Sequence, residues 1–108
     1  MIVTFEEEYL SDLYEKGKTD DKKHRYQPEI IRKYKRCIDI LLDASGIEAL
    51  YEINSLNYEA MKGDKRGASS IRVNTKYRIE FTVTEGSTEP IVTVCNILEL
   101  SNHLNKMI

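Results

Sequence analysis

Two stretches of alternating character decide the fold, residues 69–74 (SSIRVN) and residues 77–84 (YRIEFTVT). All their apolar residues have odd numbers, as in a strand whose successive side chains point to opposite faces of a sheet. Pairing Val73 with Tyr77 across the loop of residues 74–76 keeps these apolar residues on one face. The two stretches therefore predict an antiparallel β-hairpin.

The same register places Arg72 opposite Arg78 on the other face, with Cβ atoms about 5.5 Å apart. Two like charges in this position are destabilising, so we expect a compensating group. Glu80 on the same face is one candidate, and an external anion such as an RNA phosphate is the other. Both side chains point away from the apolar face, so we expect alanine at either arginine to leave the fold intact.

The remaining elements are predicted from capping residues and periodicity. Residues 2–3 form a short strand, and Thr4 with Glu7 makes a capping box for a helix that ends before Gly17. A second helix runs from Pro28 to about residue 44. Residues 47–62 fit either a short helix or an extended connection, and residues 91–97 fit a central strand. This order predicts an α+β fold with two N-terminal helices on a mainly antiparallel sheet.

Length and composition favour one globular domain over residues 1–108. The chain has 41% apolar and 31% charged residues, typical of a folded protein. We see neither a membrane-spanning run nor a secretory signal. Cys37 and Cys95 stand in apolar stretches, which favours buried thiols in a reducing compartment. We therefore expect a cytoplasmic protein.

Charge is segregated along the chain although the net charge is only −2. Residues 16–36 hold nine basic and three acidic residues, and residues 62–78 hold six and one. Such asymmetry suggests a surface that binds a polyanion. For the first run we favour the simpler interpretation, a solvated face of helix and loop. For the second run we favour anion binding, because Lys62, Lys65 and Arg66 lie in a glycine-bracketed loop directly before the hairpin.

Residues 56–81 carry a resemblance to a known family. The loop KGDKRG at residues 62–67 leads into SIRVN at residues 70–74, and YRI follows at residues 77–79. With this spacing the chain resembles the HigB-like branch of the RelE/ParE superfamily, toxins of bacterial type II toxin–antitoxin systems. The match spans about 26 residues, and the order of elements extends it to the whole chain. The resemblance implies the RelE-like microbial ribonuclease fold.

The resemblance also implies a function. Members of this branch are ribosome-dependent endoribonucleases that cut mRNA by attack of a ribose 2′-OH. Such cleavage needs a base, an acid, and cations that stabilise charge on the phosphate. By position in the motif, Arg72 and Arg78 bind the scissile phosphate. Contacts to RNA are expected from a further set of residues: Lys62, Lys65, Arg66, Lys76 and Tyr58. We expect no cofactor and no metal, since no ligand cluster is evident.

The acid and base are where the chain departs from the family. HigB-like toxins usually end their last strand with Asp-Tyr-His, and the corresponding residues 96–98 (NIL) contain no titratable group. Asn96 holds the first of these positions. His103 follows shortly after and is the candidate acid or base, although a packed or exposed tail histidine is the simpler interpretation. His24 reads as a loop residue and Tyr77 as a core residue.

Partners follow from the same resemblance. It implies a helix-turn-helix, HigA-like antitoxin, with ribosome and mRNA as targets and any DNA contact made through the antitoxin. Three alternatives remain open. They are a toxin-fold protein that binds ribosome or RNA without cutting, a gyrase-type toxin with a protein target, and a plain binding module whose main partner is an antitoxin. The two arginines favour the RNA interpretations.

Overall fold

A single sheet carries the hairpin. The computed structural model describes residues 1–61 and 67–102. Its sheet has the strand order β1-β5-β4-β3-β2, with β1 parallel to β5 and every other pair antiparallel. The strands are β1 (Ile2–Phe5), β2 (Glu59–Ala60), β3 (Ala68–Arg72), β4 (Tyr77–Glu85) and β5 (Thr93–Asn102). The predicted hairpin is β3–β4, and its register is the predicted one, with Arg72 paired to Arg78.

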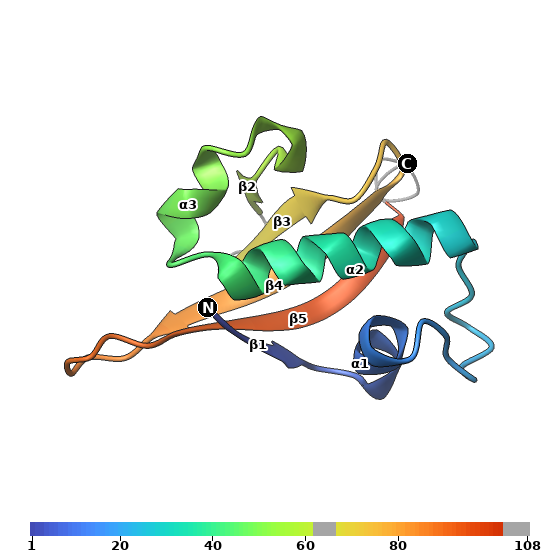
Figure 1. Ribbon diagram of the computed structural model, residues 1–108, viewed down its shortest axis with the longest axis horizontal. Coiled ribbons are helices and arrows are strands. Elements are labelled where there is room, and N and C mark those ends of the chain that lie inside the picture. Colours follow the sequence, from blue (N-terminus) through green and yellow to red (C-terminus); the bar gives the residue numbers. More distant parts are fainter. Residues whose placement is uncertain (62–66, 103–108) are drawn as a thin grey trace.

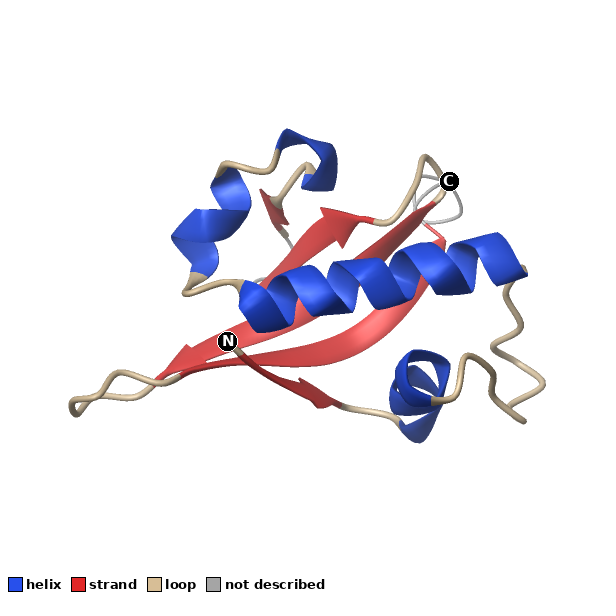
Figure 2. Cartoon of the chain, in the orientation of Figure 1, coloured by secondary structure: helices blue, strands red, loops and turns tan. Residues whose placement is uncertain are grey.

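The helices confirm the predicted α+β class. They are α1 (Glu8–Glu15), α2 (Pro28–Asp43) and α3 (Ile47–Tyr51), followed by the 3-10 turn η1 (Asn54–Leu56). The long helix α2 crosses one face of the sheet, while α1 lies at the β1 and β5 side and α3 near β2 and β3 (Figures 1 and 2). Pro28 occupies the first turn of α2, where its missing N–H costs nothing. The part of the chain that is described has no helix long and apolar enough to cross a membrane.

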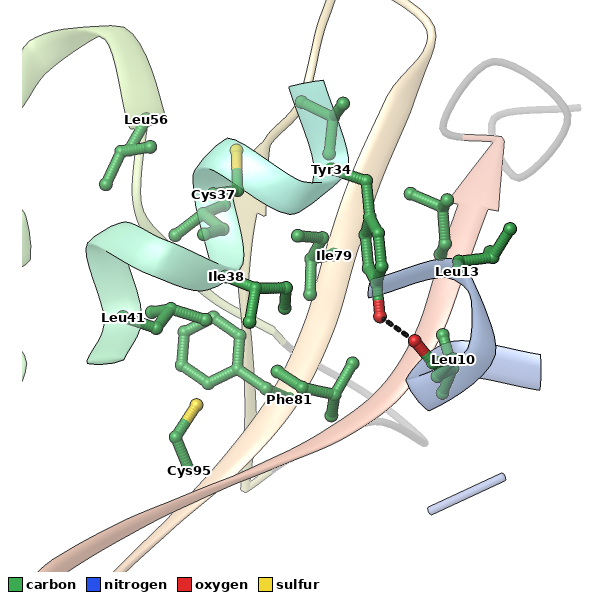
Figure 3. Packing of buried hydrophobic residues seen from close by; sticks show 14 of the residues in the cluster. Leu10, Leu13, Tyr34, Cys37, Ile38, Leu41, Leu56, Ile79, Phe81 and Cys95 are labelled. Carbon is green, nitrogen blue, oxygen red and sulfur yellow. Dashed lines mark hydrogen bonds between the residues drawn. The ribbon is translucent and has the colours of Figure 1, made fainter. Parts of the chain in front are cut away.

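The core lies between α2 and the odd-numbered face of the hairpin. Ile38 and Leu41 of α2 pack in one buried cluster with Ile79 and Phe81 of β4 (Figure 3). Tyr34, fully buried, also ties the two helices together, because its hydroxyl donates a 2.7 Å hydrogen bond to the carbonyl oxygen of Leu10 in α1. Burial raises the pKa of this hydroxyl strongly, so it remains a donor.

Removing this hydroxyl tests how much the bond between α1 and α2 contributes. Tyr34→Phe should lower the free energy of unfolding by about 1–2 kcal/mol, because the Leu10 carbonyl is left buried without its donor. The matched control is Tyr14→Phe, whose hydroxyl bonds Asp39 at an exposed position. Urea unfolding should show a smaller loss for the control, since water replaces an exposed donor. Equal losses would contradict the argument from burial.

The predicted capping box is wrong. Strand β1 extends to Phe5, and Thr4 pairs with Asn96, to which its hydroxyl donates at 2.8 Å. Helix α1 begins only at Glu8, with no side-chain cap. Pairing with β5 therefore prevails over the local capping preference. The end of the helix is as predicted, since Gly17 follows with φ at +73°, a left-handed conformation that glycine adopts without strain.

The third strand is displaced from its predicted position. Strand β5 begins at Thr93, two residues late, because Ile91 and Val92 are exposed. It continues to Asn102, well beyond the predicted end. The register shifts between Phe81, paired with Ile97, and Glu80, paired with Glu99. Leu98 is thus an extra residue, a β-bulge, and it reverses which later residues face the core.

The two cysteines lie where the sequence predicted. Both are buried and free, and burial raises the pKa of Cys37 to about 11 and that of Cys95 to about 12. Thiols with such values stay protonated at neutral pH and are inert. Their role is packing.

Candidate functional site

The arginine pair lies on the face of the sheet that α2 does not cover. Its strand neighbours Ile71 and Ile79 are fully buried on the opposite side, so alternation directs Arg72 and Arg78 away from the core. The two differ in environment. Arg72, at the end of β3, is exposed, whereas Arg78 is only 5% exposed.

Arg78 is held by three groups. Its Nε donates to the Ser70 hydroxyl at 2.9 Å, and one Nη donates to the Asn57 carbonyl at 2.7 Å. The same Nη lies 3.8 Å from a carboxylate oxygen of Glu59 on β2. Glu59 is therefore a compensating group that the sequence did not suggest.

The electrostatics of Arg78 reflect this setting. Burial lowers the pKa of its guanidinium, Glu59 opposes that effect, Arg72 adds to it and Glu80 again opposes it. Arginine keeps its charge in all such environments. Glu80, the compensating group suggested by the sequence, thus joins Glu59 in stabilising the charge.

The bulge brings residues of β5 onto this arginine face. Glu80 is 3% exposed and pairs with Glu99, and Arg78 pairs with Ser101. Uninterrupted alternation through Cys95 and Ile97 would have turned Glu99 and Ser101 toward the core. The signal that sequence reasoning missed is Leu98, an apolar residue that breaks this alternation.

Asn96 is not brought together with the arginines. It pairs with Thr82, four residues along β4 from Arg78, which corresponds to about 13 Å. Its amide group accepts from Thr4 and donates to Glu6 at 2.8 Å each. Through these contacts Asn96 links β5 to β1 and to the residue that follows it.

The two tyrosines singled out in the sequence pack toward the core. Tyr58 is half-buried, its hydroxyl lies 2.7 Å from that of Ser69, and its ring lies 6.4 Å from the ring of Phe81. The ring therefore lies on the α2 side of the sheet, away from the arginine face. Tyr77 packs edge-on against Tyr26, which agrees with its prediction as a core residue.

The other predicted residues lie in the hairpin turn, in a loop, or outside the described residues. Lys76 is exposed in the turn, which Asn74 closes by accepting from the backbone amides of Lys76 and Tyr77. His24 lies in a loop as predicted, stacked on Tyr9 with ring centroids 3.6 Å apart. Four predicted site residues lie outside the described residues: Lys62, Lys65, Arg66 and His103.

A cavity of about 260 Å³ adjoins the exposed arginine. Arg72 lines it together with Lys33 and Arg36 of α2, and its apolar lining includes Cys37 and Leu56. The Cys37 thiol donates to the carbonyl oxygen of Arg72, which fixes the end of β3 against α2. Lys33 and Arg36 thus bring two cationic side chains to this hollow, whereas Arg72 contacts Cys37 through its backbone carbonyl and its side chain points to the other face of the sheet. Over the described ranges, no group of three or more metal-ligating side chains is present.

Comparison with known proteins gives consistent matches. The model of a family described as the RelE-like toxin of the type II toxin–antitoxin system HigB matches residues 3–92. Toxin HigB-1 of Vibrio cholerae serotype O1 is 36% identical over 88 residues, which are 80% of this chain and 87% of that protein.

Solved structures agree in fold. The YoeB/ParE toxin from Agrobacterium tumefaciens superposes with a TM-score of 0.58 at 18% identity, covering 95% of this chain and 99% of that one. A YafQ mutant from E. coli gives a TM-score of 0.60 at 11% identity, covering 98% and 97%. At these identities the likeness establishes the shared fold.

Proposed function

Because the chain belongs to the HigB-like family of RelE-like toxins of type II toxin–antitoxin systems, we propose that it is an endoribonuclease that cuts mRNA on the ribosome. The observation that carries this proposal is the arginine pair, with an exposed Arg72 beside an Arg78 that the fold holds rigidly. A pair of guanidinium groups on one polar face suits a phosphate that gains charge during cleavage.

The proposed reaction is attack of a ribose 2′-OH on the adjacent phosphorus. The bond from the 2′ oxygen to phosphorus forms, the bond to the 5′ oxygen breaks, and the 2′ proton passes to a base. Arg72 contacts the phosphate oxygens, and Arg78 supplies a second fixed positive charge behind it. Arginine suits both tasks because it stays charged and can bind two oxygens at once. Proceeding this way, the reaction needs no metal.

For the proton transfers we propose His103. It directly follows Asn102, the last residue of β5, and Ser101 on that strand pairs with Arg78. Histidine is the side chain that can accept or return a proton near neutral pH. Lys76, Lys62, Lys65 and Arg66 are proposed as further RNA contacts, around the hairpin turn and the loop before β3.

Membership of this family also implies a protein partner. A toxin of a type II system has an antitoxin, and we propose one of the helix-turn-helix, HigA-like class, through which any DNA contact is made. The whole chain acts as one domain, and its site of action is the cytoplasm, where ribosomes translate.

The test is induced expression with mapping of mRNA 5′ ends on two versions of one reporter message. The versions differ only in the start codon, which is intact in one and destroyed in the other. We expect growth arrest and new 5′ ends within the translated message alone, because cutting on the ribosome requires translation. As an internal control, RNA outside coding regions should stay intact in the same cells.

Other outcomes would contradict the proposal. Equal cutting of both messages would show an RNase that does not need the ribosome. Growth arrest without new 5′ ends would show a toxin that blocks ribosome or gyrase instead of cutting. Absence of both arrest and cleavage would show a protein whose remaining activity is to bind its antitoxin.

A further inference from the structure

The outer face of α2 carries cations that the arginine pair does not explain. Arg32, Lys35 and Arg36 border an open groove of about 450 Å³ that also includes Ile31 and Asp39. Within the described residues, these three basic side chains have no hydrogen bond or ion pair, whereas the neighbouring Lys33 pairs with Glu29 at 3.4 Å. With three basic side chains and Asp39 in its lining, the groove presents net positive charge.

This groove and the cavity beside Arg72 share one lining residue. Arg36 lines both hollows, and Lys33 and Arg72 line the second. Arg32 and Arg36 are one helical turn apart, about 6 Å along α2. Arg32, Lys35 and Arg36 thus form a band of positive charge on α2, and Arg36 is followed by Cys37, whose thiol contacts the carbonyl oxygen of Arg72 at the end of β3.

We propose that this band on α2 binds the sugar-phosphate backbone of single-stranded RNA next to the segment held at Arg72. The inference rests on the proposed function and extends it to a surface outside the hairpin. It revises the simpler interpretation of the first basic run as a solvated face, since four of its cations line this groove or the cavity beside Arg72.

Charge and connectivity favour RNA as the occupant. The chain as a whole is slightly acidic, so the band does not follow from a generally basic surface. An RNA that passes from Arg72 round the end of β3, where the Arg72 carbonyl meets Cys37 of α2, would present its next phosphates to the band. Among the described residues that line the groove, Asp39 is the one acid, and its carboxylate accepts the Tyr14 hydroxyl at 2.5 Å. This hydrogen bond raises the pKa of the Tyr14 hydroxyl.

The experiment measures how binding of a short single-stranded RNA depends on salt. The RNA carries 2′-methoxy groups throughout, so it cannot be cut and the result does not depend on catalysis. The test variant combines Arg32→Ala, Lys35→Ala and Arg36→Ala. The matched control combines Lys18→Ala, Lys22→Ala and Lys23→Ala, which removes the same charge from an exposed loop.

We expect the slope of log K against log salt to become shallower by about 2 in the α2 variant, since each lost phosphate contact contributes about 0.7. The loop variant should keep the slope of the parent. Arg36→Gln alone should remove about 0.7 from the slope, which keeps the test valid if the triple variant folds poorly. Circular dichroism checks the fold of each variant.

Three results would overturn the inference. An unchanged slope in the α2 variant would show that the band does not touch RNA. Equal losses in the α2 and loop variants would show attraction by net charge alone. Parent-like RNA binding with loss of affinity for a poly-glutamate peptide would assign the band to an acidic protein partner. If the parent binds the RNA as expected but never cuts a message, the proposed nuclease function fails while this inference stands.

Discussion

Arg72→Ala is expected to lower the rate of mRNA cleavage by about 10²-fold or more while leaving the fold intact. Loss of one group that contacts and stabilises a charged transition state has an effect of this size. The fold should persist because the Arg72 side chain is exposed and, among the residues described, makes no hydrogen bond or ion pair. The measurement is the rate of appearance of cleaved message in a purified translation system, with urea unfolding alongside.

Two further variants make this result specific. Arg72→Lys keeps the charge but loses the fork of two parallel donors, so its rate should lie between those of parent and alanine variant. Arg25→Ala removes an exposed arginine from the loop before α2 and should cut as fast as the parent. A parent-like rate for Arg72→Ala, or an equal loss in Arg25→Ala, would remove Arg72 from the site.

The hairpin and α2 could be predicted because each repeats its own pattern without interruption. The odd-numbered apolar residues of β3 and β4 allow one register only, since a shift by one residue would expose Phe81. In α2, Pro28 fixes the start and one apolar stripe faces the sheet. The opposition of Arg72 and Arg78 followed from the hairpin alone.

Interactions between distant segments could not be predicted in the same way. Thr4 has the local sequence of a helix cap, but pairing of β1 with β5 places it in a strand. The bulge at Leu98 depends on how β5 fits β4, and it decides that Glu99 and Ser101 share a face with Arg78. The groups that bind Arg78 come largely from residues 57–59, a segment without periodicity.

These partners change the prediction for the second arginine. Its place on the polar face suggested that it could be removed without loss of fold, but its burial and its hydrogen bonds to Ser70 and Asn57 indicate the opposite. Arg78→Ala should lower the free energy of unfolding by about 3 kcal/mol, because it leaves buried acceptors unpaired and a cavity behind. Urea unfolding of the purified variant measures this loss.

Glu59→Gln separates the contribution of the ion pair from that of the hydrogen bonds. The Glu59 side chain is 56% exposed and its oxygen lies 3.8 Å from the guanidinium, so the charge pair contributes little. We expect a loss of at most about 1 kcal/mol. If Glu59→Gln were as destabilising as Arg78→Ala, the ion pair would be what holds Arg78. If neither variant were destabilised, Arg78 would be free to act on RNA as Arg72 does, and the division into one exposed contact and one fixed charge would be wrong.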